Sequence, residues 1–579
     1  MAISFSHLRL VAVALCAICL RTESYAADEA PYPRSVTFTA FPELKSHEFS
    51  RGEEVRILVL PELPPDAPRL RKVRHAQATA GLLYLAQIGE VIRCGAWNTS
   101  FLNDAILMAV EAYTVAAEVE DSAPDRVRWY EERVRVLKSL ERFIESRVEM
   151  GTEAPHDLLF TRFFRYQAEA DLLRLKDEIA RDGNAKSRPL VTKSLEAFFR
   201  DTKEPTYTAF PEFQPPPGPG DPGGKNDPFA EKKDDPWTGL PELATDAAPL
   251  RKIQIALACA GLSHQFCINE IIRIGSWADM WSVYVAAAAN LLNTTLAITE
   301  LEQIANRMPW YERAVVHMKY YERAIKRRVS IGSVAPHTAN LLIFRRLEAE
   351  ARLLQLKDEI TKSGAKPTPP GKRTAINREI IRANSPEIPY TAFPELKPPT
   401  IELQENKDPH SNRYPGYVEK NTAPLPPLPT LMANDSPLRK VLLAQVREGL
   451  AYLAYMKEII SIGSWNQTFF PQYLRITNDV FRVAAELEPA KRMPWYETRI
   501  RRLKAVEQFM LMRVKKGTAP PHALDLASFV RLQAEVDLLK LKAEVEPVRQ
   551  PLAAPICQPV YCPPACICRP RILPRLFRR

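Results

Sequence analysis

One pattern occurs three times along the chain, and this repetition limits the possible folds more than any other feature of the sequence. Each copy contains, in the same order, a Thr-Ala-Phe-Pro-Glu motif, a Leu-Arg-Lys motif, a Gly-x-Trp motif and a Trp-Tyr-Glu motif. From the tryptophan of the last motif to the next helix-breaking glycine there are 22 residues in every copy: Trp129 to Gly151, Trp310 to Gly332 and Trp495 to Gly517. Such constant spacing indicates that the copies are packed structure.

Each copy predicts four helices. In the first copy, apolar residues at three- and four-residue steps predict helices over residues 70–94 and 102–120. The third helix of the later copies begins near Pro309 and Pro494, because proline at the first helical position loses no hydrogen bond. The fourth helix begins at the proline of a Pro-His pair in each copy: Pro155, Pro336 and Pro521.

The fourth helix carries apolar side chains at heptad spacing, which are Phe163, Tyr166, Ala170 and Leu173 in the first copy. A seam of this period packs against a long antiparallel partner, and we expect the third helix of the same copy to be that partner. On the fourth helix of each copy a glutamate lies four residues after an arginine, at positions 165/169, 346/350 and 531/535. We expect these to be surface pairs worth about 0.3 kcal/mol each. The predicted fold class is all-α, with three tandem antiparallel helical-bundle repeats of coiled-coil hairpins joined by Pro-rich linkers.

The motifs and the proline-rich stretches between them divide the chain. The predicted parts are a signal peptide (1–26), a proline-containing lead segment (27–66), three helical repeats (67–182, 248–363 and 436–546), a Pro/Gly-rich linker (183–247), a Pro-rich linker (364–435) and a Cys/Arg/Pro-rich tail (547–579). Linkers of this composition are extended and semi-stiff, so we expect the repeats to behave as separate units on a spaced string. The Phe-Pro-Glu motifs are either short recognition peptides or, as we favour, staples that dock on the adjacent bundle.

Both ends of the chain bear on its location. Residues 1–26 combine Arg9, an apolar run over residues 10–20 and a Ser24-Tyr25-Ala26 cleavage motif, which are the features of a secretory signal peptide. The run is too short to span a bilayer. We therefore expect an exported mature chain without a transmembrane segment, in the periplasm, outside the cell or on its surface. The tail either contacts an anionic surface or is a disordered, solubilising end, and its basic residues are Arg569, Arg571, Arg575, Arg578 and Arg579.

A histidine follows the proline at the start of the fourth helix in every copy: His156, His337 and His522. Glu153 and His156 fit half of a di-metal carboxylate pattern, but the later copies have Val334 and Ala519 at the glutamate position. We therefore interpret the Gly-Thr/Ser-x-x-Pro-His motif as a turn between two helices. The sequence predicts no metal site and no cofactor.

Aromatic residues are the candidate binding residues, because their rings can stack on sugars; the alternative is that they anchor the core. They are Trp97, Trp277, Trp465, Trp129, Tyr130, Trp310, Tyr311, Trp495 and Tyr496. Repeated glutamates could form paired carboxylates for acid–base chemistry, although solvated or capping roles fit them better. They are Glu90, Glu270 and Glu458 on the first helix and Glu131, Glu312 and Glu497 on the third. The sequence has no Gly-x-Ser-x-Gly elbow, and we predict no catalytic residue.

The cysteines fall into two groups. Cys94, Cys259 and Cys267 have no counterparts in the other copies and are interpreted as buried thiols. The candidates for disulfide bonds, within or between exported molecules, are the four cysteines of the tail: Cys557, Cys562, Cys566 and Cys568.

The hairpin between the third and fourth helices resembles that of TolC-type outer-membrane efflux proteins. The residues that carry the resemblance are Arg147, Gly151, Asp157-Leu158-Leu159, Ala168-Glu169 and Leu172. The same segment resembles repeats in exported proteins of planctomycete-type bacteria. Efflux proteins of this family form trimeric β-barrels with a tunnel, yet the sequence has no runs of alternating strand pattern. The resemblance therefore implies a coiled-coil hairpin in the cell envelope and no channel.

These patterns predict an exported, non-enzymatic helical repeat protein that acts as a scaffold or adaptor of the bacterial cell envelope. Its expected partners are other envelope proteins or further copies of itself, together with an anionic surface through the tail. A net charge of +10 over 579 residues gives no reason to expect a specific nucleic acid. The alternative is a carbohydrate- or peptide-binding module of the envelope. An efflux-associated component or an envelope enzyme is less favoured.

Overall fold

The computed structural model describes residues 38–47, 56–97, 101–182, 191–215, 239–241, 246–274, 281–367, 373–375, 391–403, 417–420, 423–432, 434–461 and 469–545. Nearly all regular structure in these ranges is helical, so the predicted all-α class is confirmed. None of the described helices is both long enough and apolar enough to cross a membrane.

Four helices come from the first copy: α2 (Arg69–Arg93), α3 (Leu102–Val119), α4 (Ala123–Glu149) and α5 (Pro155–Asp182). Local sequence sets their ends. Ser122 caps α4 by accepting a hydrogen bond from the backbone N–H of Asp125 at 3.2 Å. Gly95 and Gly151 follow α2 and α4 with left-handed φ angles of 72° and 69°, a conformation that glycine adopts without strain.

The second and third copies give matching sets. The second contains α7 (Pro249–Ile274), α8 (Trp281–Thr299), α9 (Met308–Ser330) and α10 (Pro336–Ser363). The third contains α12 (Pro437–Ser461), α13 (Phe470–Leu487), α14 (Arg492–Lys515) and α15 (Pro521–Val545). The short helix α6 (Leu195–Asp201) lies between the first and second sets, and the 3-10 turns η2 (Ile304–Arg307) and η4 (Pro489–Lys491) directly precede α9 and α14.

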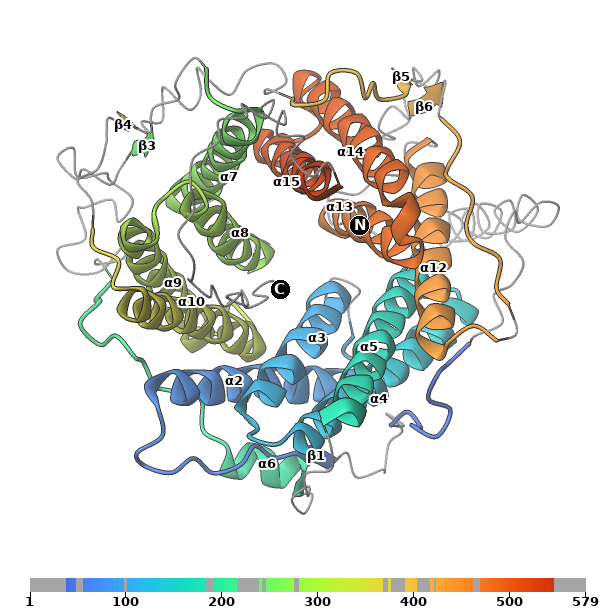
Figure 1. The fold of residues 1–579 in the computed structure, drawn as a ribbon. Helices are drawn as coiled ribbons and strands as arrows, with labels where there is room; N and C mark the ends of the chain where they lie inside the picture. The colour runs from blue at the N-terminus through green and yellow to red at the C-terminus, as the bar shows by residue number, and fades with distance from the viewer. Residues whose placement is uncertain are drawn as a thin grey trace, which may run out of the picture.

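The three sets of helices close into a ring (Figure 1). Within a copy each helix packs against the next, and the fourth helix also packs along the first helix of another copy. The pairs between copies are α5 with α12, α15 with α7, and α10 with α2. The expectation of separate units on a spaced string is therefore wrong. Extended linkers set how far apart two units can lie, but they do not prevent complementary helix faces from packing.

A glycine on the first helix lies at each contact between copies. Gly81, Gly261 and Gly449 occupy matched positions, and a Cβ atom there would approach a phenylalanine of another copy's fourth helix to 3.0–3.1 Å. These phenylalanines are Phe344, Phe529 and Phe163. Phe163 belongs to the heptad seam, for which we expected the third helix of the same copy as the partner. Helix α5 does pack against α4, and it also packs against α12 of the third copy.

The segments between the helices form three two-stranded antiparallel sheets. The pairs are β1 (Arg56–Leu58) with β2 (Thr192–Ser194), β3 (Gly239–Pro241) with β4 (Arg373–Ala375), and β5 (Thr400–Leu403) with β6 (Tyr417–Lys420). Two of these pairs join different predicted segments, because β1 precedes the first copy and β2 follows it, while β3 and β4 flank the second copy. The described strands therefore join the segments predicted as lead and linkers to one another.

Candidate functional site

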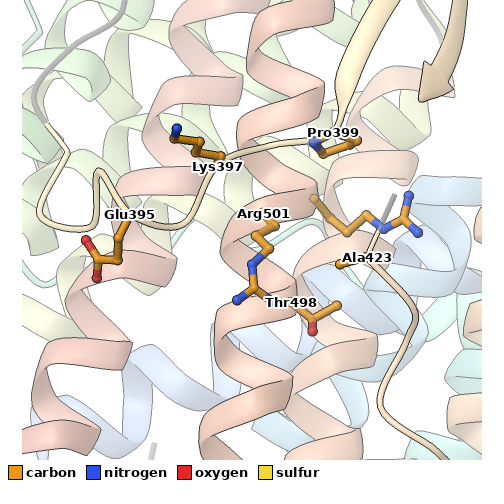
Figure 2. A pocket seen from close by; sticks show the side chains of 7 residues that line it. Glu395, Lys397, Pro399, Ala423, Thr498 and Arg501 are labelled. Atoms are coloured by element: carbon orange, nitrogen blue, oxygen red, sulfur yellow. The ribbon is translucent and has the colours of Figure 1, made fainter. Parts of the chain in front are cut away.

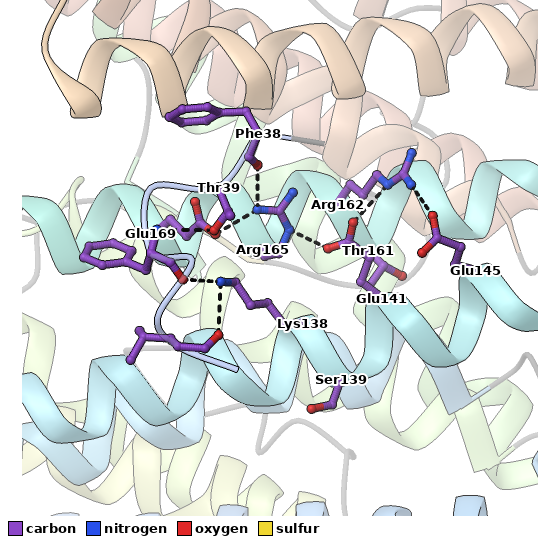
Figure 3. A network of polar contacts seen from close by, with 12 residues as sticks. Phe38, Thr39, Lys138, Ser139, Glu141, Glu145, Thr161, Arg162, Arg165 and Glu169 are labelled. Carbon is purple, nitrogen blue, oxygen red and sulfur yellow. Dashed lines mark hydrogen bonds and ion pairs between the residues drawn. The ribbon is translucent and has the colours of Figure 1, made fainter. Parts of the chain in front are cut away.

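A group of buried charged side chains lies under each of the Thr-Ala-Phe-Pro-Glu segments, which we call the arms (residues 39–44, 208–213 and 391–396). Figure 3 shows the first arm on α4 and α5. The Thr39 hydroxyl and the Ala40 backbone N–H donate to the two carboxylate oxygens of Glu169, at 2.7 and 2.9 Å. The ammonium group of Lys138 donates to the carbonyls of Phe41 and Leu44. The arm is thus held by main-chain and side-chain bonds.

Arg165 lies between two carboxylates in the same network. Its guanidinium group is 2.5 Å from Glu141 and 2.8 Å from Glu169, and it donates to the Phe38 carbonyl at 3.2 Å. The side chains of Arg165 and Glu169 are only 3% and 0% exposed. Burial lowers the pKa of Lys138. A buried charge is costly without partners, and here each charged group has them.

The other two arms repeat this geometry. Thr208 and Ala209 bind Glu350, both at 2.7 Å, and Thr391 and Ala392 bind Glu535, both at 2.8 Å. Each glutamate also pairs with the arginine four residues before it. The expectation that these three arginine–glutamate pairs lie on the surface is wrong, because the arm covers them.

The apolar part of each arm is buried on the helices. Phe41, Phe210 and Phe393 are all buried, and a lysine of the fourth helix lies 4.6–4.8 Å from each ring centre. Arg69 of α2 lies over the Phe210 ring at 5.5 Å, so the second arm contacts two copies at once. The arms are staples in this structure. The most deeply buried charges of the first network, Arg165 and Glu169, are engaged in holding the arm and are covered by it.

The repeated histidines lie between copies. His156 contacts the rings of Tyr455 and Phe469 in the third copy, at centroid distances of 5.5 and 4.7 Å. His337 contacts Phe101 of the first copy, which matches Phe469, at 5.1 Å, and Tyr84, which matches Tyr452, at 5.7 Å. The preceding glycines have φ angles of 69–72°, as a turn requires. The motif therefore forms a turn and also places an aromatic ring in the contact between copies.

The histidine of the third copy also lies between copies. The ring centre of His522 is 5.8 Å from that of His264 in the second copy. Burial lowers the pKa of His156, His337 and His522 to about 4, so all three rings are neutral at pH 7. Burial raises the pKa of the neighbouring Asp157 to about 7. No group of three or more possible metal ligands occurs among the described residues.

The predicted aromatic binding residues lie largely in the core. Trp97 donates to Glu153 at 3.1 Å, and Trp129 donates to Glu120 at 2.9 Å. The other buried members of the set are Trp310, Tyr311 and Trp495, while Tyr130 and Tyr496 are half-buried beneath arginines. Trp277 and Trp465 lie outside the described residues. Protein side chains cover the described indole rings, so these rings are placed as core anchors and not as a stacking surface.

Glu90 and Glu131, two of the candidates for a paired carboxylate, have separate partners. Glu90 pairs with Arg93 at 2.5 Å, whereas Glu131 pairs with Lys176 at 3.1 Å.

Cys94 is exposed, so its interpretation as a buried thiol is wrong, and Cys259 and Cys267 are half-buried. The predicted signal peptide and the tail, with the predicted disulfide cysteines and anion-contacting arginines, lie outside the described residues.

The sequence reasoning missed a charged set to which α3, α10 and α13 each contribute side chains; α3 and α13 lie on the inner side of the ring (Figure 1). We call it the inner cluster: Asp104, Glu111, Arg345, Arg475 and Asp479. Arg345 pairs with Glu111 at 2.7 Å, and Arg475 lies 3.8 Å from Asp479 and also interacts electrostatically with Glu111 and Arg345. Burial lowers the pKa of Arg475 and raises that of Asp104 to about 7. All three copies contribute to this cluster.

The inner cluster is only partly exposed: the side chains of Glu111 and Arg475 are 29% and 32% exposed, whereas that of Arg345 is 11% exposed. The signal that could have found it is a difference between the copies. The position of Arg475 on the second helix is Leu107 in the first copy and Ala289 in the second. A charge that only one copy carries cannot serve the packing that all three copies share.

No family model, no curated protein and no solved structure matches this chain. Its function must therefore be inferred from its own geometry.

Proposed function

We propose that the chain is an exported, non-enzymatic scaffold or adaptor of the bacterial cell envelope, built from three tandem helical repeats and Pro-rich linkers. One observation carries the proposal: the buried glutamates and the histidines that recur in all three copies take part in packing. Glu169, Glu350 and Glu535 hold the arms. The repeated histidines fill the contacts between copies. A threefold catalytic site would instead need its shared groups open to a substrate.

The positions that differ between copies are the natural places for a partner to bind. The inner cluster is one such place, and the basic tail is another, because clustered arginines attract anionic surfaces. A closed ring suits a scaffold because its helices stay at fixed distances from one another. Partners that bind at different positions on the ring are therefore held at fixed distances too. The expected partners are envelope proteins or further copies of this chain.

Cell fractionation tests the proposal. The full chain and a chain that ends at residue 546 are expressed in a bacterial host, and the cytoplasmic, soluble exported and envelope fractions are probed with an antibody. We expect the full chain in the envelope fraction and the shortened chain in the soluble exported fraction. Retention of both chains in the cytoplasm would contradict export, and equal envelope binding of both would contradict anchoring by the tail.

A second candidate is a module that binds a carbohydrate or a peptide of the envelope. The partly exposed charges of the inner cluster favour it. Titration with cell-wall fragments, followed by tryptophan fluorescence, separates the two functions. A scaffold with buried tryptophans should show no saturable change in emission, whereas a saturable change would favour the binding module.

A further inference from the structure

A pocket with a volume of about 180 Å³ lies between the third arm and α14 (Figure 2). Residues of the arm and of the stretch after it form one wall, α14 forms the other, and Ala423 closes one side. The residues of these two walls are Glu395, Lys397 and Pro399, and Thr498, Arg501 and Arg502.

The same place in the first copy contains a built-in carboxylate. Glu132 of α4 occupies the position of Thr498, three residues after the shared tryptophan. Its carboxylate accepts a hydrogen bond from Arg135 at 3.0 Å and lies 2.7 Å from the ring nitrogen of His47. The Glu132 side chain is only 7% exposed. This crevice between arm and helix is therefore able to hold a carboxylate.

The third copy keeps the arginine and lacks the acid. Arg501 occupies the position of Arg135, but threonine replaces Glu132 and Pro399 replaces His47. Threonine is shorter than glutamate, and its hydroxyl group donates to the Pro494 carbonyl at 2.7 Å. The pocket opens where the Glu132 side chain lies in the first copy.

The charge of the lining favours an anion. Three of its residues are basic (Lys397, Arg501 and Arg502) and one, Glu395, is acidic. Figure 2 shows Glu395 on the opposite side of the pocket from Pro399. Arg502 is paired with Glu419 at 2.6 Å. Arg501 has a weaker partner in Glu497, at 3.2 Å on the same face of the helix, which leaves most of its five donors available.

We propose that this pocket binds a carboxylate group supplied by a ligand, held by Arg501 at the position that the Glu132 carboxylate occupies in the first copy, with Lys397 adding positive charge to the lining. The volume is below the roughly 300 Å³ of the smallest ordinary small-molecule sites. It fits one acidic side chain or the carboxyl end of a peptide. The guanidinium group of Arg501 binds such a group in a planar, bidentate way.

Saturation-transfer NMR on the full chain tests the proposal, with propionate as the analogue of a glutamate side chain and propionamide as its uncharged twin. We expect propionate to bind with a dissociation constant on the order of millimolar, and propionamide to bind at least about tenfold more weakly. Substitution R501Q should weaken propionate binding about tenfold or more. The matched substitution R135Q in the first copy should leave the affinity unchanged.

The substitution T498E supplies the sharper test, because it gives the third copy the residue of the first copy. We expect it to abolish propionate binding while the helical circular dichroism and the unfolding midpoint stay at their wild-type values, since the introduced carboxylate fills the pocket. Propionate binding that survives both T498E and R501Q would overturn the proposal, as would equal binding of propionamide. Tighter binding of inorganic phosphate than of propionate would reassign the pocket to phosphate groups.

Discussion

A single glutamate with no exposed surface holds each arm to the helices. Glu169 accepts bonds from Thr39, Ala40 and Arg165, so its carboxylate has partners that replace the water it loses. The net contribution of such a buried ion pair to the stability of the fold is small. Removal of the Glu169 charge, however, leaves the buried positive charge of Arg165 only partly neutralised. Position 169 should therefore be far more sensitive than exposed positions on the same helix.

Substitution E169Q should lower the free energy of unfolding by about 3 kcal/mol, because it breaks a buried, hydrogen-bonded ion pair. The control is E178Q, at an exposed position on α5, which should change the stability by less than about 0.5 kcal/mol. Denaturant unfolding of both variants measures the difference. Equal costs for the two substitutions would show that the arm is not held by Glu169.

The contact between the second and third copies should be sensitive to acid. Burial, with a further effect of His522, lowers the pKa of His264 to about 3. The unfolded ring titrates near 6.5, so below that pH the unfolded chain takes up a proton that the folded chain does not. Stability is therefore lost as the pH falls from 6.5 towards 3, by up to about 1.4 kcal/mol per pH unit for this ring.

The substitution H264Y tests this effect with a residue that the other copies already carry, since Tyr84 and Tyr452 occupy the matched positions. Between pH 7 and pH 5 the wild-type chain should lose about 2 kcal/mol more stability than H264Y. Unfolding in denaturant at the two pH values gives both losses. A variant that loses as much stability as the wild-type chain would contradict the neutral, buried state of His264.

At the scale of elements, the sequence predicts the helices well and their partners poorly. The helix predicted over residues 70–94 is observed as Arg69–Arg93, and Pro155, Pro336 and Pro521 begin helices as expected. Periodicity reveals that a helix has an apolar face, but not which surface covers that face. Gly449 was not recognised as the contact of Phe163, because 286 residues separate the two in the sequence.

Two glycines of α2 allow the effect of close packing on stability to be measured separately from the effect of helix propensity. A Cβ atom at Gly81 would lie 2.5 Å from Ala112 and 3.1 Å from Phe344, whereas a Cβ atom at Gly89 would have no heavy atom within 4 Å. Substitution G81A should therefore destabilise the protein by about 1–3 kcal/mol through overpacking. Substitution G89A should stabilise it by up to about 1 kcal/mol. Thermal unfolding measures both shifts, and a neutral or stabilising G81A would contradict the close approach of α3 and α10 to α2 at this position.

At the scale of the whole molecule, the ring joins the first copy to the third as firmly as neighbours in sequence. The repeat pattern alone could not predict this closure, because identical units fit an open row, a closed ring or separate beads equally well. The inner cluster was missed for the same reason. Its members belong to three copies, and only the closed ring brings Glu111, Arg345 and Arg475 together.

Zero-length carbodiimide cross-linking, read by mass spectrometry of the monomer band, tests the closure most directly. Arg174 of α5 and Glu486 of α13 form an ion pair at 2.7 Å between the first and third copies. In the variant R174K, position 174 should therefore form an amide with Glu486. Lys540 and Glu300, 3.3 Å apart between the third and second copies, supply a native cross-link in the same sample. A ring predicts both links within one chain, and a sample with the native link but no link between positions 174 and 486 would show that the ring is open.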